Sequence, residues 1–235
     1  ILDDDNFESS ISKGVTHVMS NSGQSCNAPT RMLVPKNRHN EALEIAKSVA
    51  ESIVVGEPAS LTSEIGPLVS KVQYDKVQKL INKGISEGAK LVTGGQGRPA
   101  DLVNGFYAKP TVFGHVTNDM TIAREEIFGP VLAVLSYDSI EDAIRIYNDT
   151  EYGLAVGVLT NDFRKARIMR DECDAGMIYW NGGSIAAESH LAFGGVKKSG
   201  NGFPSAARTY RAVTHEISWT VNHADSLMFP QGMSK

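Results

Sequence analysis

The chain has 235 residues, a formal net charge of −4 and an apolar content of 41%, which is typical of a soluble globular protein. The mild charge argues against nucleic acid or an anionic membrane surface as a partner, and no apolar run approaches the roughly 20 residues that span a bilayer. Two cysteines in this length argue against a disulfide scaffold and favour a reducing, cytoplasmic location.

The hydrophobic spacing predicts helices that alternate with strands along most of the chain. Strands that alternate with helices of about 10–15 residues predict an α/β fold, in which a mainly parallel twisted sheet carries helices on both faces. The first expected elements are a helix over 6–19, a strand over 31–34, a helix capped by Asn40 and ended by Gly56, and a helix over 71–82 with Val72 facing inward. Strands over 89–93 and 131–136 follow, and then a helix over 140–148 capped by Ser139. The last expected elements of this series are a strand over 154–160, a helix from its cap Asp162 to Cys173, and a strand over 176–180.

The pattern changes after Trp180. Residues 181–202 are rich in Gly, Ser, Ala and Lys and are expected to form loops, which often carry function. Residues 213–221 then alternate, with Ile217 and Trp219 on the apolar face, and this predicts a half-buried strand. The strand has no sequential partner, so it is either a local edge strand or a strand added to the sheet of another subunit.

Cys26 is the candidate nucleophile. It follows a run of small, polar residues that includes Gly23, so nothing bulky crowds its sulfur. A thiol attacks a substrate only as the thiolate and only where the substrate reaches it. The alternative is a buried structural cysteine, the commoner fate of a lone Cys. Cys173 falls on a helical pattern and is expected to be such a packing residue.

Three segments resemble motifs of the aldehyde dehydrogenase superfamily. Gly23–Cys26 is similar to its active-site cysteine motif, Glu125–Pro130 to its Glu-Glu-Ile-Phe-Gly-Pro element, and Phe193–Gly200 to its Phe-Gly-Gly-x-x-x-Ser-Gly element. Their order and spacing also match, and the resemblance covers essentially the whole chain. The implied fold is that of the catalytic domain of the superfamily.

The resemblance further implies that the chain is the C-terminal half of such an enzyme. Residues 1–202 would form the thiol-bearing catalytic domain, and 203–235 a tail whose strand at 213–221 joins subunits into a homo-oligomer. The dinucleotide-binding domain, the usual general base and the Asn of the oxyanion hole would precede Ile1 and are expected to be absent.

The implied reaction is oxidation of a small aldehyde to a carboxylic acid with NAD or NADP, through a thiohemiacetal and a thioester on Cys26. Glu126 would bind the ribose hydroxyls and Phe128 would pack beside the nicotinamide. Gln73 and Lys76 match positions near the cofactor ribose, but an ordinary exposed helix face explains them equally well.

The resemblance also suggests substrate contacts in the loops. Residues 181–193 are expected to line the aldehyde entrance, where Ala186 and Ala187 replace a bulkier residue and leave a roomier or more polar pocket. The sequence around Ser199–Asn201 is closer to relatives that act on acidic semialdehydes. No residues show metal-ligand spacing. The expected substrate-binding residues are Ser25, Asn181, Ser189, His190 and Phe193.

Two functions of other classes remain open from the sequence. One is a non-catalytic remnant that folds and oligomerises through its tail. The other is a residual esterase in which Cys26 attacks activated esters without a cofactor.

Overall fold

The computed structural model describes residues 1–182, 190–202, 205, 208–221, 223 and 225. Its centre is a four-stranded sheet in the order β1-β4-β3-β2, formed by Arg31–Pro35, Val131–Tyr137, Thr111–Gly114 and Lys90–Thr93. β1, β4 and β3 are parallel, and β2 is antiparallel to β3. Two smaller sheets pair β6 (Ala155–Val158) with β7 (Met177–Trp180) in parallel, and β5 (Tyr152–Gly153) with β8 (Val196–Lys197) in antiparallel fashion.

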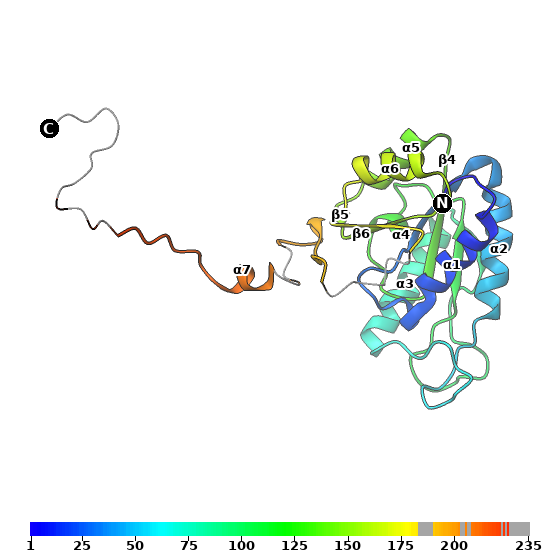
Figure 1. Ribbon diagram of the computed structural model, residues 1–235. Helices are drawn as coiled ribbons and strands as arrows, with labels where there is room; N and C mark the ends of the chain where they lie inside the picture. Colours follow the sequence, from blue (N-terminus) through cyan, green and yellow to red (C-terminus); the bar gives the residue numbers. More distant parts are fainter. Residues whose placement is uncertain (183–189, 203–204, 206–207, 222, 224, 226–235) are drawn as a thin grey trace.

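Helices cover both faces of the central sheet (Figure 1). α1 (Phe7–Met19) and α2 (His39–Ser52) pack on one face, while α3 (Lys71–Ser86), α4 (Thr121–Arg124) and α5 (Ile140–Asn148) pack on the other. β4 is buried on both sides, since alternate residues enter the two cores. α6 (Phe163–Glu172) packs against β6 and β7. The expected α/β fold with a mainly parallel sheet is confirmed.

Local capping explains several helix starts. Ser70 accepts a hydrogen bond from the backbone N–H of Gln73, and the predicted caps Ser139 and Asp162 do the same at α5 and α6. The predicted cap at Asn40 is wrong, because α2 begins one residue earlier, at His39, without a side-chain cap.

Two further expectations are corrected. α3 continues through Gly84 to Ser86, and Val72 is 80% exposed because it lies on the side of α3 away from the core. β3 was not expected from the pattern, because four fully buried residues show no alternation. In the C-terminal segment, the strand predicted over 213–221 pairs with no described part of this chain, and its pairing with another subunit stays a prediction.

That C-terminal segment instead begins in a short helix, α7 (Thr209–Val213). From Thr214 onward its described residues belong to neither helix nor sheet, and the segment extends away from the sheet in Figure 1. Ile217 and Trp219 are each 87% exposed. A strand needs a neighbour for its backbone groups, and nothing described within this chain supplies one here.

Candidate active site

The thiol lies just after a strained turn at the end of α1. Asn21, Ser22 and Gly23 are consecutive residues with positive φ, at 52°, 56° and 70°. Non-glycine residues adopt this conformation only when their surroundings hold them there, and such strain clusters at functional sites. The chain then enters a turn, closed by a hydrogen bond from Ala28 N to Ser25 O at 3.0 Å, in which Cys26 is exposed.

Two long-range hydrogen bonds hold this turn. The Ser22 hydroxyl is buried and donates to the carbonyl oxygen of Gly66 at 2.7 Å. The Gln24 side-chain oxygen accepts from the backbone N–H of Val69 at 2.9 Å. The segment before the thiol is therefore attached to the loop that leads into α3.

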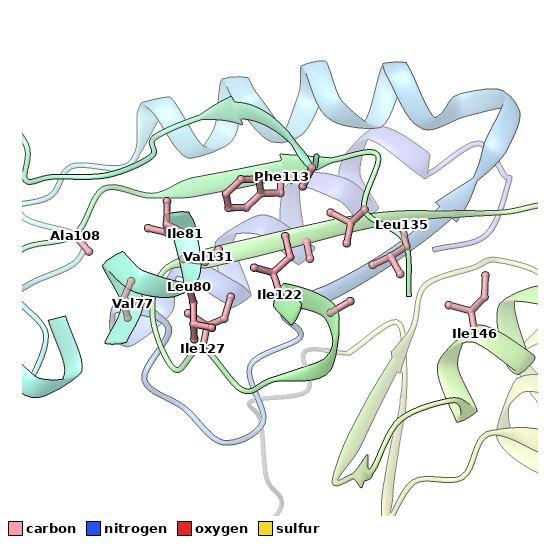
Figure 2. Packing of buried hydrophobic residues seen from close by; sticks show 14 of the residues in the cluster. Val77, Leu80, Ile81, Ala108, Phe113, Ile122, Ile127, Val131, Leu135 and Ile146 are labelled. Atoms are coloured by element: carbon pink, nitrogen blue, oxygen red, sulfur yellow. The ribbon is translucent and has the colours of Figure 1, made fainter. Parts of the chain in front are cut away.

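The loop 125–130 forms the facing wall. Phe128 has a positive φ of 56°, and the carbonyls beside it are held by Gln73, whose side-chain nitrogen donates to Ile127 O at 3.0 Å and to Phe128 O at 2.7 Å. Figure 2 shows Ile127 within the core beside Val77 of α3. With Ile127 buried, the neighbouring Glu126 remains exposed.

One cavity of about 410 Å³ brings these segments together. Ser25 and Cys26 line it from the thiol turn, and Glu126 and Phe128 line it from the facing loop. The structure thus places a reachable thiol, an exposed carboxylate and an aromatic ring around the same space. A thiol, a carboxylate and an aromatic ring around one cavity make it a candidate site for a nucleophile and a bound ligand.

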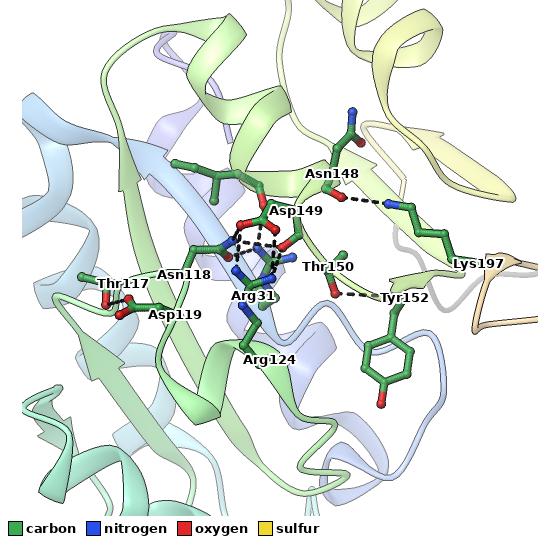
Figure 3. A network of polar contacts seen from close by, with 11 residues as sticks. Arg31, Thr117, Asn118, Asp119, Arg124, Asn148, Asp149, Thr150, Tyr152 and Lys197 are labelled. Atoms are coloured by element: carbon green, nitrogen blue, oxygen red, sulfur yellow. Dashed lines mark hydrogen bonds and ion pairs between the residues drawn. The ribbon is translucent and has the colours of Figure 1, made fainter.

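A polar network forms another part of the cavity wall (Figure 3). Arg31 donates to the Asn118 side chain and to Ile146 O, the latter at 2.8 Å, while Arg124 pairs with Asp149 at 2.7 Å. Burial, and then the charge of Arg124, lower the pKa of Arg31. The network joins the start of β1 to α4 and to the loop after α5, and so braces the chain just after the thiol.

The two cysteines lie in opposite environments. Cys173 is 7% exposed, and burial together with Glu172 raises the pKa of its thiol to about 11. Such a thiol carries almost no thiolate at neutral pH. Cys26 is exposed and lines the cavity.

The other residues singled out from the sequence are more scattered. Lys76 is exposed one turn from Gln73, and neither lines the cavity. The side chain of Asn181 is bonded to the backbone of Thr160, accepting from its N–H at 2.9 Å and donating to its carbonyl at 2.8 Å. His190 is exposed and Phe193 is half-buried, and both lie outside the lining of the cavity. Ser189 falls outside the described residues.

Sequence reasoning missed how this site is supported. Gln73, singled out from the sequence as a residue near the cofactor ribose, holds the loop carbonyls, and Ser22 and Gln24, which were not singled out, hold the thiol turn. Only the polar run before Cys26 hinted at the last two, because their partners lie more than 40 residues away. Among the described residues no His, Cys, Asp or Glu group is arranged to hold a metal ion. In that same part of the chain, no helix has both the length and the apolar character needed to cross a bilayer.

Comparison with known sequences gives a consistent answer. The sequence model of the "Aldehyde dehydrogenase family" matches residues 1–218. A 3-succinoylsemialdehyde-pyridine dehydrogenase from a Pseudomonas species is 46% identical over 202 residues, which are 86% of this chain and 42% of that protein.

Solved structures agree. Aldehyde dehydrogenase C of Pseudomonas syringae, a cysteine-to-alanine mutant in complex with NAD⁺ and octanal, has a TM-score of 0.84 and 44% identity, covering 88% of this chain and 42% of that one. A Mycobacterium tuberculosis aldehyde dehydrogenase in complex with NAD⁺ has a TM-score of 0.83 and 42% identity, covering 88% and 43%. This chain spans well under half the length of these relatives, and it belongs to the aldehyde dehydrogenase family.

Proposed function

We propose that this chain provides the thiol-bearing part of an enzyme that oxidises an aldehyde to a carboxylic acid with NAD or NADP, and that Cys26 is the nucleophile. The observation that carries the proposal is the shared cavity: the exposed Cys26 thiol, Glu126 and Phe128 all line it. Cys173, the other thiol, is buried and protonated.

The proposed chemistry begins when the Cys26 thiolate adds to the aldehyde carbon and a thiohemiacetal forms. Backbone N–H groups near Cys26 would stabilise the developing oxyanion, and a single such donor is typically worth about 2.7–4 kcal/mol. The thiohemiacetal loses its hydride and its hydroxyl proton and becomes a thioester. Water then attacks the thioester, which releases the carboxylic acid and returns the thiol.

Bound NAD⁺ or NADP⁺ would supply the hydride acceptor. The residues present fit such a group: Glu126 is an exposed carboxylate whose two oxygens can accept from neighbouring ribose hydroxyls, and Phe128 offers a ring in the same cavity. The proposed role of Gln73 is indirect, since its amide is bonded to the loop that carries both residues. Lys76 remains a proposed ribose contact.

The proposed substrate is a small aldehyde, with an acidic semialdehyde as the narrower proposal. The relative named for 3-succinoylsemialdehyde-pyridine supports a substrate with a polar tail. Ser25 lines the cavity beside the thiol and is the first candidate contact. The remaining proposed contacts lie in the loops after β7 and are Asn181, Ser189, His190 and Phe193.

The test compares Cys26→Ala with Cys173→Ala as its matched control. Limited iodoacetamide treatment followed by peptide mapping should label Cys26 in the folded wild-type chain, and Cys173→Ala should keep this labelling while Cys26→Ala loses it. Faster labelling of Cys173 would refute the assignment.

The same two variants separate the alternatives. Cleavage of a nitrophenyl ester that only Cys26→Ala abolishes would show that the thiol reacts with acyl groups. If the wild-type chain neither cleaves the ester nor labels at Cys26, the non-catalytic oligomerising module becomes the better account.

A further inference from the structure

Three asparagines are each followed directly by a glycine: Asn104, Asn181 and Asn201. In such a pair the backbone nitrogen of the glycine can attack the side-chain carbonyl carbon of the asparagine, because glycine has no Cβ to obstruct the approach. Both residues of each pair are exposed, so access to solvent does not distinguish the three pairs. What distinguishes them is how each asparagine side chain is held.

The side-chain amide of Asn181 is bonded at both its oxygen and its nitrogen. The oxygen accepts from the backbone N–H of Thr160 at 2.9 Å, and the nitrogen donates to Thr160 O at 2.8 Å. The backbone N–H of Asn181 also donates to Val158 O at 2.9 Å, which attaches the residue to the end of β6. The side-chain carbon can reach the nitrogen of Gly182 only after the two bonds to Thr160 break.

Asn104 lies between β2 and β3 and has no such restraint. Among the residues that the structure describes, none forms a hydrogen bond with its side chain or with the backbone N–H of Gly105. The side chain of Asn201 likewise has no hydrogen-bond partner in the described part of the chain, and a Cβ on Gly202 would meet nothing within 4 Å. Both side chains can therefore turn toward the following backbone nitrogen without losing a contact.

We propose that Asn104 and Asn201 are sites of spontaneous deamidation in the folded chain, and that the hydrogen bonds to Thr160 protect Asn181. The glycine nitrogen forms a bond to the side-chain carbonyl carbon and gives up its proton, and the side-chain nitrogen leaves as ammonia. Water then opens the cyclic imide at either of its carbonyl groups, which yields aspartate or isoaspartate. The reaction consumes only water, and the inference does not depend on the proposed enzymatic activity.

A product at Asn104 would change a turn that is joined to the support of the thiol turn. The backbone N–H of Leu68 donates to Phe106 O at 2.9 Å, two residues after Asn104. The next residue, Val69, donates to the side chain of Gln24 at 2.9 Å. Aspartate would add a negative charge to this turn, and isoaspartate would also lengthen its main chain by a carbon atom.

The test is peptide mapping of the folded chain after prolonged incubation at mildly alkaline pH, which favours loss of the proton from the glycine nitrogen. Trypsin cleaves after Lys and Arg except before proline, so each pair falls in a peptide of its own, over residues 91–109, 171–197 and 199–208. Aspartate and isoaspartate have the same mass and differ in chromatographic retention, so both products can be measured. The same incubation in guanidinium chloride is the control, because it removes the fold and keeps the sequence.

In the folded chain we expect Asn104 and Asn201 to convert about ten-fold faster than Asn181 or more, because two hydrogen bonds must open before Asn181 reacts. In guanidinium chloride the three rates should become similar. Equal rates at the three sites in the folded chain would overturn the protection by Thr160. If Asn104 converts as slowly as Asn181 in the folded chain but rapidly in the unfolded chain, its assignment as a modification site is wrong.

Asn104→Gln is the matched variant. Glutamine keeps the amide but must close a larger ring, which forms more slowly, so the product in peptide 91–109 should nearly disappear while that in 199–208 is unchanged. A product that persists in peptide 91–109 of this variant would place the modification at another residue.

Discussion

Gly23 and Gly129 lie in direct backbone contact, since a Cβ placed on Gly23 would overlap the carbonyl oxygen of Gly129. This contact joins the turn before Cys26 to the loop that carries Glu126 and Phe128. Gly23 also has a φ of +70°. Both the close backbone contact and the positive φ require glycine at this position.

Gly23→Ala should therefore destabilise the fold by about 2 kcal/mol or more, through a strained φ and a displaced loop. Urea unfolding measures the change. Gly202→Ala is the matched control, because a Cβ there meets nothing within 4 Å, and it should shift stability by less than about 0.5 kcal/mol. Equal effects of the two substitutions would show that the contact is unimportant.

Gln73→Ala removes the two hydrogen bonds to Ile127 O and Phe128 O and leaves two partly buried carbonyls without these partners. We expect a loss of about 1–3 kcal/mol in unfolding free energy, with faster amide exchange across 125–130. Lys76 lies on the same helix but is exposed, so Lys76→Ala should change neither the unfolding free energy nor the amide exchange across 125–130. An unchanged exchange rate in Gln73→Ala would mean that the loop is held by its own packing.

For the 235-residue chain studied with a free amino group at Ile1, stability should depend on pH. Burial lowers the pKa of this amine from 8.0 to about 6, so between pH 6 and pH 8 the unfolded chain binds more protons than the folded chain. Stability should thus rise from pH 6 to pH 8, by roughly 2–3 kcal/mol at most. Thermal or urea unfolding across this range measures it.

Acetylation of the amine provides the control for that experiment. In the acetylated chain, stability should no longer rise above pH 6.5. Burial also lowers the pKa values of His17 and His39, and any change in stability that these two side chains cause at lower pH should remain. Identical pH profiles for both chains would contradict the assignment to the amine.

This chain alone should show little NAD-dependent oxidation of an aldehyde. The chain spans 42% of the length of a relative, so more than half of the residues of that protein have no counterpart in it. The measurement is NADH absorbance with aldehyde, on a sample of verified mass. A robust aldehyde-dependent rise that Cys26→Ala abolishes would show that the chain is sufficient.

The tail should drive self-association. Ile217 and Trp219 are exposed, and burying large apolar side chains stabilises by ~1.5–3 kcal/mol each, offset in part by the ordering of the tail. Deleting residues 213–235 should shift an oligomer toward monomer in light scattering. An oligomer unchanged by the deletion would place the interface on another surface.

The sequence predicted most helices and strands because their signals are local. The caps at Ser139 and Asp162 act within three residues, and the buried run of β4 is long enough to recognise. β3 was missed because it is too short for a period to show, and Val72 was misplaced because helical spacing alone does not say which side of α3 meets the core.

Family membership and the candidate thiol followed from the sequence alone, since a motif is a property of neighbouring residues. Tertiary structure decided what surrounds that thiol: the contact of Gly23 with Gly129, the bonds from Gln73 to the facing loop, and the bonds from Ser22 and Gln24 to the loop before α3. These partners are separated by tens of residues or more, and no local pattern encodes such distances. They become neighbours only when burial of the two cores fixes the helices against the sheet.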